Sequence, residues 1–157
     1  MEAKIGIKKE RLELVSESLA KIMADEMILY TKTKKAHWII TGADFYSKHL
    51  FFEDQYKKLE EIIDEVAERI RAIGHFPPVT LEQYLALTHL TEKSMGSTDS
   101  LYLIKELLAD HEAILMHIRQ NIDRYATDFR DAGTSDYITG LMEVHEKMGW
   151  MLRSHIQ

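Results

Sequence analysis

The chain has 157 residues, of which 45% are hydrophobic and 29% charged, with a formal net charge of −6 and no cysteine. This length suits a single domain over residues 1–157, and no apolar run is long enough to span a bilayer. The lack of cysteine excludes disulfides, thiolate metal sites and cysteine nucleophiles, and the acidic balance argues against a broadly basic nucleic-acid surface.

Residues 1–8 are predicted to form a short N-terminal tail. The start of the chain lacks the apolar core of a secretory signal, so the expected compartment is the cytoplasm. Basic residues exceed acidic ones by only two within the first twelve positions, where Lys4, Lys8, Lys9 and Arg11 stand against Glu2 and Glu10. At most, this composition predicts a weak phosphate-binding tail.

Apolar residues recur at helical spacing in four long segments, and no segment alternates with period two for long enough to indicate a sheet. The first predicted helix covers about residues 9–38 and the second about residues 44–73. The third carries an apolar stripe from Leu101 to Tyr125, and the fourth carries one from Ile138 to Leu152. Each stripe gives its helix one face to bury against the others.

Helix breakers separate these four segments: Gly42, Gly74 with Pro77 and Pro78, Gly96, and Gly133. Thr80 and Gln83 form a capping-box pattern that predicts a short helix within the longest connection. That connection is long enough to cross the bundle, whereas the links after the first and third helices are short. The sequence therefore predicts an all-α, ferritin-like four-helix bundle with one long crossover that carries a short extra helix.

Five potential metal ligands lie within one stretch of the sequence: His37, His49, Glu53, Asp64 and Glu68. The last four share one edge of the second helix, since 100° per residue places them at roughly 0°, 40°, 60° and 100°. His49 with Glu53, and Asp64 with Glu68, are i, i+4 pairs that can converge on one ion. However, a rise of about 1.5 Å per residue separates His49 from Asp64 by roughly 22 Å. One chain cannot gather all five ligands around one ion, so the two halves must serve different ions or different chains.

A second copy of the chain resolves this separation. If two such helices pack antiparallel about a two-fold axis near residues 56–58, His49 of one chain approaches Asp64 and Glu68 of the other. The short link places His37 beside the same site. The mixture of imidazole and carboxylate suits iron, manganese or zinc, and the carboxylates favour iron.

A less specific interpretation stays open, because charged runs such as Lys57, Glu61, Glu65 and Arg69 are typical of a solvated helix face. His111 and His145 lie on apolar stripes and are predicted to be core or interface residues. The Glu-x-x-His motif of di-iron sites inside a single bundle does not occur in the sequence. This leaves the site between chains as the candidate.

The sequence resembles the Dps family, the DNA-binding proteins from starved cells, which are mini-ferritins. The resemblance covers nearly the whole chain and is strongest over KAHWIITGADFYSKHLFFEDQYKKLEEIIDEVAERIRAIG. It rests on the His-Trp pair at His37, the second His twelve residues later, and Asp64 with Glu68 in an Asp-x-x-Ala-Glu-Arg-like run. The C-terminal HEKMGWMLRSHI also resembles the family's last helix.

The resemblance implies a hollow dodecamer that binds Fe(II) at its two-fold interfaces, oxidises it preferentially with hydrogen peroxide and stores ferric mineral, protecting the cell and its DNA from oxidative damage. The di-iron site would comprise His37, His49 and Glu53 of one subunit with Asp64 and Glu68 of its neighbour. Many members have Asp where this chain has Glu53, so the weaker second iron position is expected to differ. Candidate residues for the three-fold iron pores are Asp128 and Asp131.

Direct DNA binding is expected to be weak or absent, because twelve chains of net charge −6 would carry −72 and repel phosphates. Localisation is expected in the cytoplasm, with association with the nucleoid as an open alternative. The leading prediction is a ferroxidase and iron-storage oligomer. The competing hypotheses are a non-enzymatic helical assembly that uses the same interface without redox turnover, and a DNA-compacting protein, which the charge disfavours.

Overall fold

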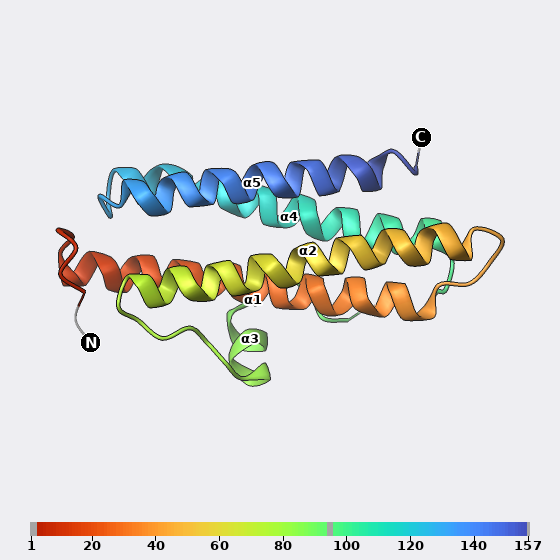
Figure 1. The fold of residues 1–157 in the computed structure, drawn as a ribbon, viewed down its shortest axis with the longest axis horizontal. Coiled ribbons are helices and arrows are strands. Elements are labelled where there is room, and N and C mark those ends of the chain that lie inside the picture. Colours follow the sequence, from red (N-terminus) through yellow and green to blue (C-terminus); the bar gives the residue numbers. More distant parts are fainter. Residues whose placement is uncertain (1–2, 94–95, 157) are drawn as a thin grey trace.

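The computed structural model describes residues 3–93 and 96–156 and shows an all-helical chain within those ranges (Figure 1). Four long helices and one short helix form along this part of the chain: α1 (Lys9–Ile39), α2 (Phe45–Ala72), α3 (Leu81–Leu87), α4 (Ser100–Ala126) and α5 (Ala132–Arg153). The predicted all-α class and the predicted positions of the long helices are confirmed.

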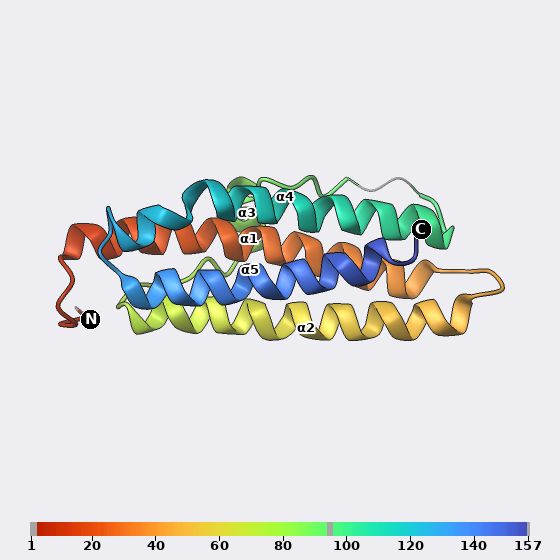
Figure 2. The ribbon, with the colours of Figure 1, turned by 90° about the horizontal axis from the view of Figure 1, so that it is seen from above.

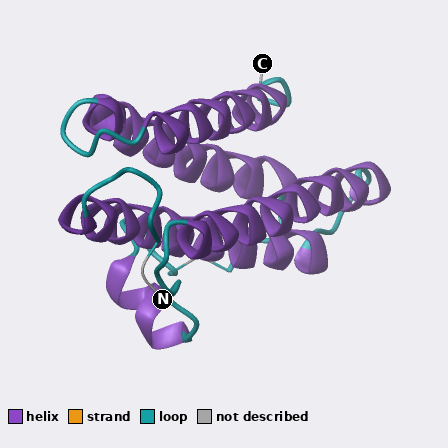
Figure 3. Cartoon of the chain, turned by 60° about the vertical axis from the view of Figure 1, so that its left-hand side comes forward, coloured by secondary structure: helices purple, strands orange, loops and turns teal. Residues whose placement is uncertain are grey.

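The four long helices pack as two antiparallel pairs. The α1–α2 pair forms one layer and the α4–α5 pair lies against it, as the two perpendicular views show (Figures 1 and 2). The connection from α2 to α4 runs along the outside of the bundle and carries α3, which packs against α1 (Figures 1 and 3). The predicted long crossover with a short extra helix is therefore present.

Local hydrogen bonds explain where α3 and α5 begin. The Thr80 hydroxyl accepts from the Gln83 backbone N–H, and the Gln83 side chain accepts from the Thr80 N–H, which completes the predicted capping box of α3. At α5, the Asp131 side chain accepts from the Thr134 N–H at 2.9 Å. The expectation that Gly133 precedes the fourth helix is wrong, because this cap starts α5 at Ala132 and places Gly133 in its first turn.

The core lies between the two helical pairs and is built from fully buried aliphatic and aromatic side chains. Burying each such side chain stabilises the fold by about 1.5–3 kcal/mol. Among the long helices, the largest come from α1, α2 and α4: Leu19, Leu29, Phe52, Leu59, Ile62, Ile70, Leu103, Ile104, Leu107 and Tyr125, while α5 contributes Ile138 and Leu152. Among the described residues, no helix is both long enough and apolar enough to cross a membrane.

One buried polar network interrupts this core. Glu26 on α1, His111 on α4 and His145 on α5 are each at most 1% exposed. His145 Nε2 lies 2.8 Å from Glu26 Oε1, and the two Nδ1 atoms of His111 and His145 lie 2.9 Å apart. Both histidines are therefore buried and hydrogen-bonded, as predicted for core residues. Burial, and then the neighbouring His145, hold the pKa of His111 well below its ordinary value.

Candidate metal centre

His37 and His49 lie beside each other at one end of the bundle. His37 occupies the last turn of α1, and His49 lies in the first turns of α2. The short link between these helices includes Gly42 at φ 121°, a backbone conformation that favours glycine, and it returns α2 alongside α1 (Figure 2). The two imidazole rings stack with centroids 3.7 Å apart and planes 21° apart. Sequence reasoning placed these two residues together correctly.

Two reciprocal hydrogen bonds hold this pair. His37 Nδ1 lies 2.8 Å from the His49 carbonyl oxygen, and His49 Nδ1 lies 2.8 Å from the His37 carbonyl oxygen. A carbonyl oxygen can only accept, so each Nδ1 carries the proton and donates it. In the neutral rings, each Nε2 then keeps its lone pair. Hydrogen bonding of one ring nitrogen to a backbone carbonyl is the usual arrangement behind a metal-ligating histidine.

Glu53 adds a carboxylate close to the histidine pair. It lies one turn after His49 on α2 and is partly exposed. Its Oε1 is 2.5 Å from Lys57 Nζ, and this ion pair lowers the pKa of Glu53, with smaller contributions in the same direction from His37 and His49. The carboxylate is therefore ionised at neutral pH and already pairs with a cation.

Asp64 and Glu68 do not meet the histidine pair within one chain. Both are exposed on the same helix, α2, and the helical rise places Asp64 roughly 22 Å from His49. Asp64 lines an open groove with Met23, Ile63 and neighbouring residues of α2. Over residues 3–93 and 96–156, no three His, Asp or Glu side chains converge on a point where they could hold one metal ion.

The two candidate pore residues differ in exposure. The Asp128 side chain is 62% exposed and pairs with Arg124 at 3.5 Å. Asp131 is buried, caps α5 and accepts a hydrogen bond from Arg69 at 3.1 Å. The carboxylate of Asp131 is thus occupied by hydrogen bonds that hold the fold together, whereas the carboxylate of Asp128 is exposed. Only Asp128 has the exposure that a pore-lining acid needs, and its pore role stays a prediction.

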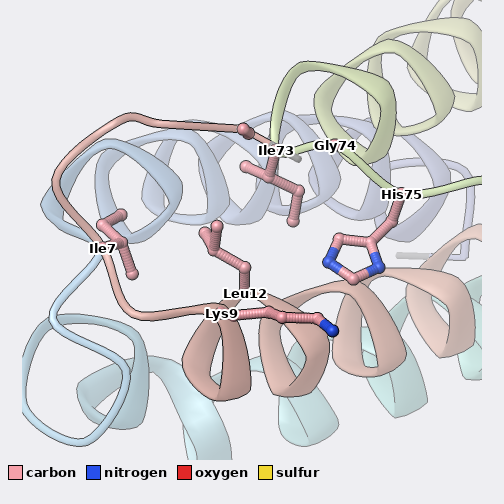
Figure 4. A pocket seen from close by; sticks show the side chains of 7 residues that line it. Ile7, Lys9, Leu12, Ile73, Gly74 and His75 are labelled. Atoms are coloured by element: carbon pink, nitrogen blue, oxygen red, sulfur yellow. The ribbon is translucent and has the colours of Figure 1, made fainter. Parts of the chain in front are cut away.

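A separate cavity lies at the opposite end of α1. It has a volume of about 370 Å³ and lies between the N-terminal segment, the start of α1 and the end of α2. Figure 4 shows Ile7, Leu12 and Ile73 on its apolar side, with the Lys9 amine and the His75 ring on the other. A cation and an apolar wall, with no carboxylate in the lining, do not suit a metal ion.

Sequence reasoning assigned no role to His89 and His117, which are 28 residues apart in the chain. The structure brings their rings into contact beside the buried carboxylate of Asp25. No spacing in the sequence signals this cluster, because its members come from α1, the crossover and α4.

Comparison with known proteins identifies the family. Residues 16–157 match the ferritin-like domain family. The chain is 40% identical over 153 residues to an uncharacterized low temperature-induced protein from Nostoc sp., covering 98% of this chain and 86% of that protein. It is 34% identical to DNA protection during starvation protein 2 of Bacillus anthracis, covering 90% of this chain and 96% of that protein.

A solved structure gives the same answer for the fold. The DPS protein from Vibrio cholerae O1, described as a member of a broad superfamily of ferritin-like diiron-carboxylate proteins, matches with a TM-score of 0.92. The two chains are 27% identical, and the match covers 99% of this chain and 97% of that one. The fold, the sequence relatives and the domain match agree: this chain belongs to the Dps family of ferritin-like proteins.

Proposed function

We propose that this chain assembles into a hollow homo-oligomer, a dodecamer, that binds Fe(II) between two-fold-related subunits, oxidises it and stores the ferric product. Membership of the Dps family supports a general role in iron storage and stress protection. The diiron-carboxylate description of the Vibrio cholerae relative supports iron as the metal. The specific site and the oxidation step are our own inference from the residues.

The observation that carries the proposal is a pair of imidazoles oriented for metal binding, with fewer carboxylates beside them than a di-iron site needs. His37 and His49 keep both Nε2 lone pairs available because their Nδ1 protons are held by backbone carbonyls. Glu53 is the one carboxylate beside them that belongs to the candidate set. Asp64 and Glu68 carry the missing oxygen ligands but lie too far along α2, so a second chain has to supply them.

The surface around the histidine pair also favours contact with a second chain. Four large hydrophobic side chains near the α1–α2 link are exposed in the single chain: Trp38, Phe45, Tyr46 and Leu50. Trp38 is 69% exposed and Tyr46 is 74% exposed, although both lie within nine residues of His37. Exposed apolar groups gathered in this way are typical of an interface between subunits.

The chemistry follows from holding two Fe(II) substrate ions together. Each ion gives up one electron, and the two electrons reduce one hydrogen peroxide, whose O–O bond breaks as two protons are taken up to give two waters. Because both electrons arrive at one site, no hydroxyl radical is released. His37, His49 and Glu53 would bind the ions on one side, with Asp64 and Glu68 of the partner subunit on the other.

The direct test is an anaerobic Fe(II) titration followed by addition of hydrogen peroxide, with oxygen as a second arm. The proposal predicts stoichiometric Fe(II) binding and a prompt rise in ferric absorbance. His37→Ala and Asp64→Ala variants should assemble to the same particle mass by light scattering yet oxidise Fe(II) far more slowly. Stoichiometric binding without any peroxide-dependent rise would favour the non-enzymatic assembly instead, and wild-type rates in both variants would reject these residues as the site.

A further inference from the structure

The cavity at the start of α1 lies far from the proposed iron site. Lys9 and Leu12 line it from the first turn of α1, and Ile73 and His75 line it from just after the end of α2. Lys9 and His37 are 28 residues apart on one helix, which separates the cavity from the histidine pair by roughly 42 Å. Its volume of about 370 Å³ falls within the range of about 300–1,000 Å³ that small-molecule sites occupy. The cavity is therefore a separate place on the molecule and is large enough for a small organic ligand.

One wall of this cavity is apolar and is formed by Ala3, Ile7, Leu12 and Ile73. Leu12 is 3% exposed and Ile73 is 1% exposed, and both belong to the hydrophobic core. Ala3 and Ile7 come from the N-terminal segment and pack against the same core. Figure 4 shows the side chains of Ile7, Leu12 and Ile73 gathered around the cavity. This apolar wall suits a short hydrocarbon chain, because each methylene that it covers leaves water.

The other side of the cavity carries a positive charge and a second hydrogen-bond donor. The Lys9 amine and the His75 ring both lie on this side (Figure 4). A lysine ammonium has three donors, and an imidazole donates from at least one ring nitrogen in either charge state. Lys9 Nζ lies 3.7 Å from Glu13 Oε1, but the two side chains are 67% and 48% exposed, so this ion pair contributes little to stability. An anion in the cavity can therefore share the Lys9 ammonium with Glu13 or replace it.

Backbone hydrogen bonds fix the segment that carries His75. The His75 N–H donates to the Ile70 carbonyl oxygen at 3.1 Å, and the Gly74 N–H donates to the Arg71 carbonyl oxygen at 3.0 Å. With Gly74 at φ 91°, these two bonds form a Schellman motif at the end of α2. The Arg71 guanidinium also donates to the His75 carbonyl oxygen at 2.9 Å. The donor side of the cavity is thus built on a held turn.

We propose that this cavity binds a small organic carboxylate with a short apolar chain. The Lys9 ammonium and the His75 imidazole bind the carboxylate, and the apolar wall covers the chain. One ammonium matches the single charge of a carboxylate, whereas the second charge of a phosphate monoester would lie unpaired beside the apolar wall. The site is independent of the iron chemistry proposed above.

The test is a saturation-transfer NMR titration of the assembled protein, with sodium hexanoate as the probe. Hexanoate should bind saturably, whereas hexylammonium, which has the same chain and the opposite charge, should not bind. Butyrate should bind roughly tenfold more weakly, because the two methylenes that it lacks each contribute up to about fourfold in affinity. No saturable binding of hexanoate, equal binding of butyrate, or equal binding of hexylammonium would overturn the proposal.

A pair of lysine variants locates the bound carboxylate. Lys9→Met removes the charge but keeps an unbranched side chain, and it should weaken hexanoate binding by about tenfold or more. Lys8→Met is the matched control, because Lys8 is exposed and does not line the cavity, and it should leave the affinity unchanged. Equal affinities in the Lys9→Met and wild-type proteins, or equal weakening by both changes, would overturn the assignment.

A third variant tests the apolar wall. Ile7→Ser should reduce the difference in affinity between hexanoate and butyrate, because it removes part of the surface that covers the chain. Circular dichroism establishes that each variant keeps its helices. An unchanged difference in the folded Ile7→Ser protein would reject the apolar wall as the place of the chain. None of these measurements involves iron, so their outcome does not depend on whether the proposed ferroxidase site is correct.

Discussion

The proposed shared site can be tested by restoring activity from two inactive chains. One variant carries His37→Ala and His49→Ala, and the other carries Asp64→Ala and Glu68→Ala. Roughly 22 Å of helix separates the two halves, against metal bonds of about 2.0–2.2 Å, so under the proposal each half of one site comes from a different chain. Each variant alone should therefore be inactive, and a co-expressed mixture should regain activity.

The expected size of the rescue follows from the two-fold symmetry. With random pairing, about half of the interfaces join unlike chains, and one of the two sites in each such interface combines intact histidines with intact carboxylates. The mixed oligomer should thus show about a quarter of the wild-type initial rate per chain. The assay is ferric absorbance after peroxide is added to anaerobically loaded protein, with each particle mass measured by light scattering.

A matched control uses two other exposed carboxylates of α2. Glu60→Ala with Glu61→Ala removes the same charge from the same helix and should leave the rate near that of the wild-type protein. If the mixture is no more active than its two components, the site is not shared between chains. If either variant alone keeps full activity, its residues are not the ligands.

Four further outcomes follow from the structure. Lys57→Met should tighten Fe(II) binding in the anaerobic titration, because Glu53 would lose a competing cation. The gain should be less than about fivefold, because the Lys57–Glu53 ion pair is largely exposed. Weaker Fe(II) binding would contradict a ligand role for Glu53. In the folded state the lowered pKa of His111 keeps its ring neutral, whereas in the unfolded chain the ring binds a proton below its ordinary pKa of 6.5. The contribution of His111 to the free energy of unfolding is therefore complete above pH 6.5. It is lost as the pH falls from 6.5 toward the lowered pKa of the folded state. Urea titrations from pH 7 to 5 should show a slope of up to about 1.4 kcal/mol per pH unit that His111→Asn reduces, and an unchanged slope would reject this origin. Leu59→Ala should cost about 2–5 kcal/mol of unfolding free energy in the same titration, whereas the exposed Met116→Ala should stay within about 0.5 kcal/mol. Purified protein should not shift DNA in a gel at moderate salt without added magnesium. A clear shift would show that the protein has a DNA-binding surface despite its net charge of −6.

The fold was predictable because the apolar residues of the four long segments follow the helical period closely. The short helix was equally predictable, since Thr80 and Gln83 are both needed for a capping box and both make it. The start of α5 was not predicted correctly, because glycine is usually taken as a helix breaker and Gly133 was therefore expected to precede the helix. Asp131 supplies a side-chain cap two residues earlier, and this local hydrogen bond outweighs the low helix propensity of glycine.

The candidate site was predictable only in part. The short link brings His37 beside His49, so their proximity follows from the sequence. The reciprocal bonds to backbone carbonyls do not, because they depend on the backbone positions of two helix ends. The hydrogen bond between Arg69 and Asp131 could not be predicted from residue spacing either, since 62 residues separate the two in the chain. Contacts of that kind depend on how helices pack, which the sequence pattern of any one helix does not contain.

The buried network of Glu26, His111 and His145 also bears on the axial alignment of the bundle. Two apolar stripes can shift along the helix axis with little change in contact. They therefore determine which helix faces meet more strongly than they determine the axial alignment of the helices. A slip of one turn, about 5.4 Å, would break both hydrogen bonds and leave charged or polar atoms unpaired in the core. The three helices are thereby held in one axial alignment, which also fixes the positions of their ends and of the surfaces that would meet other subunits in the proposed oligomer.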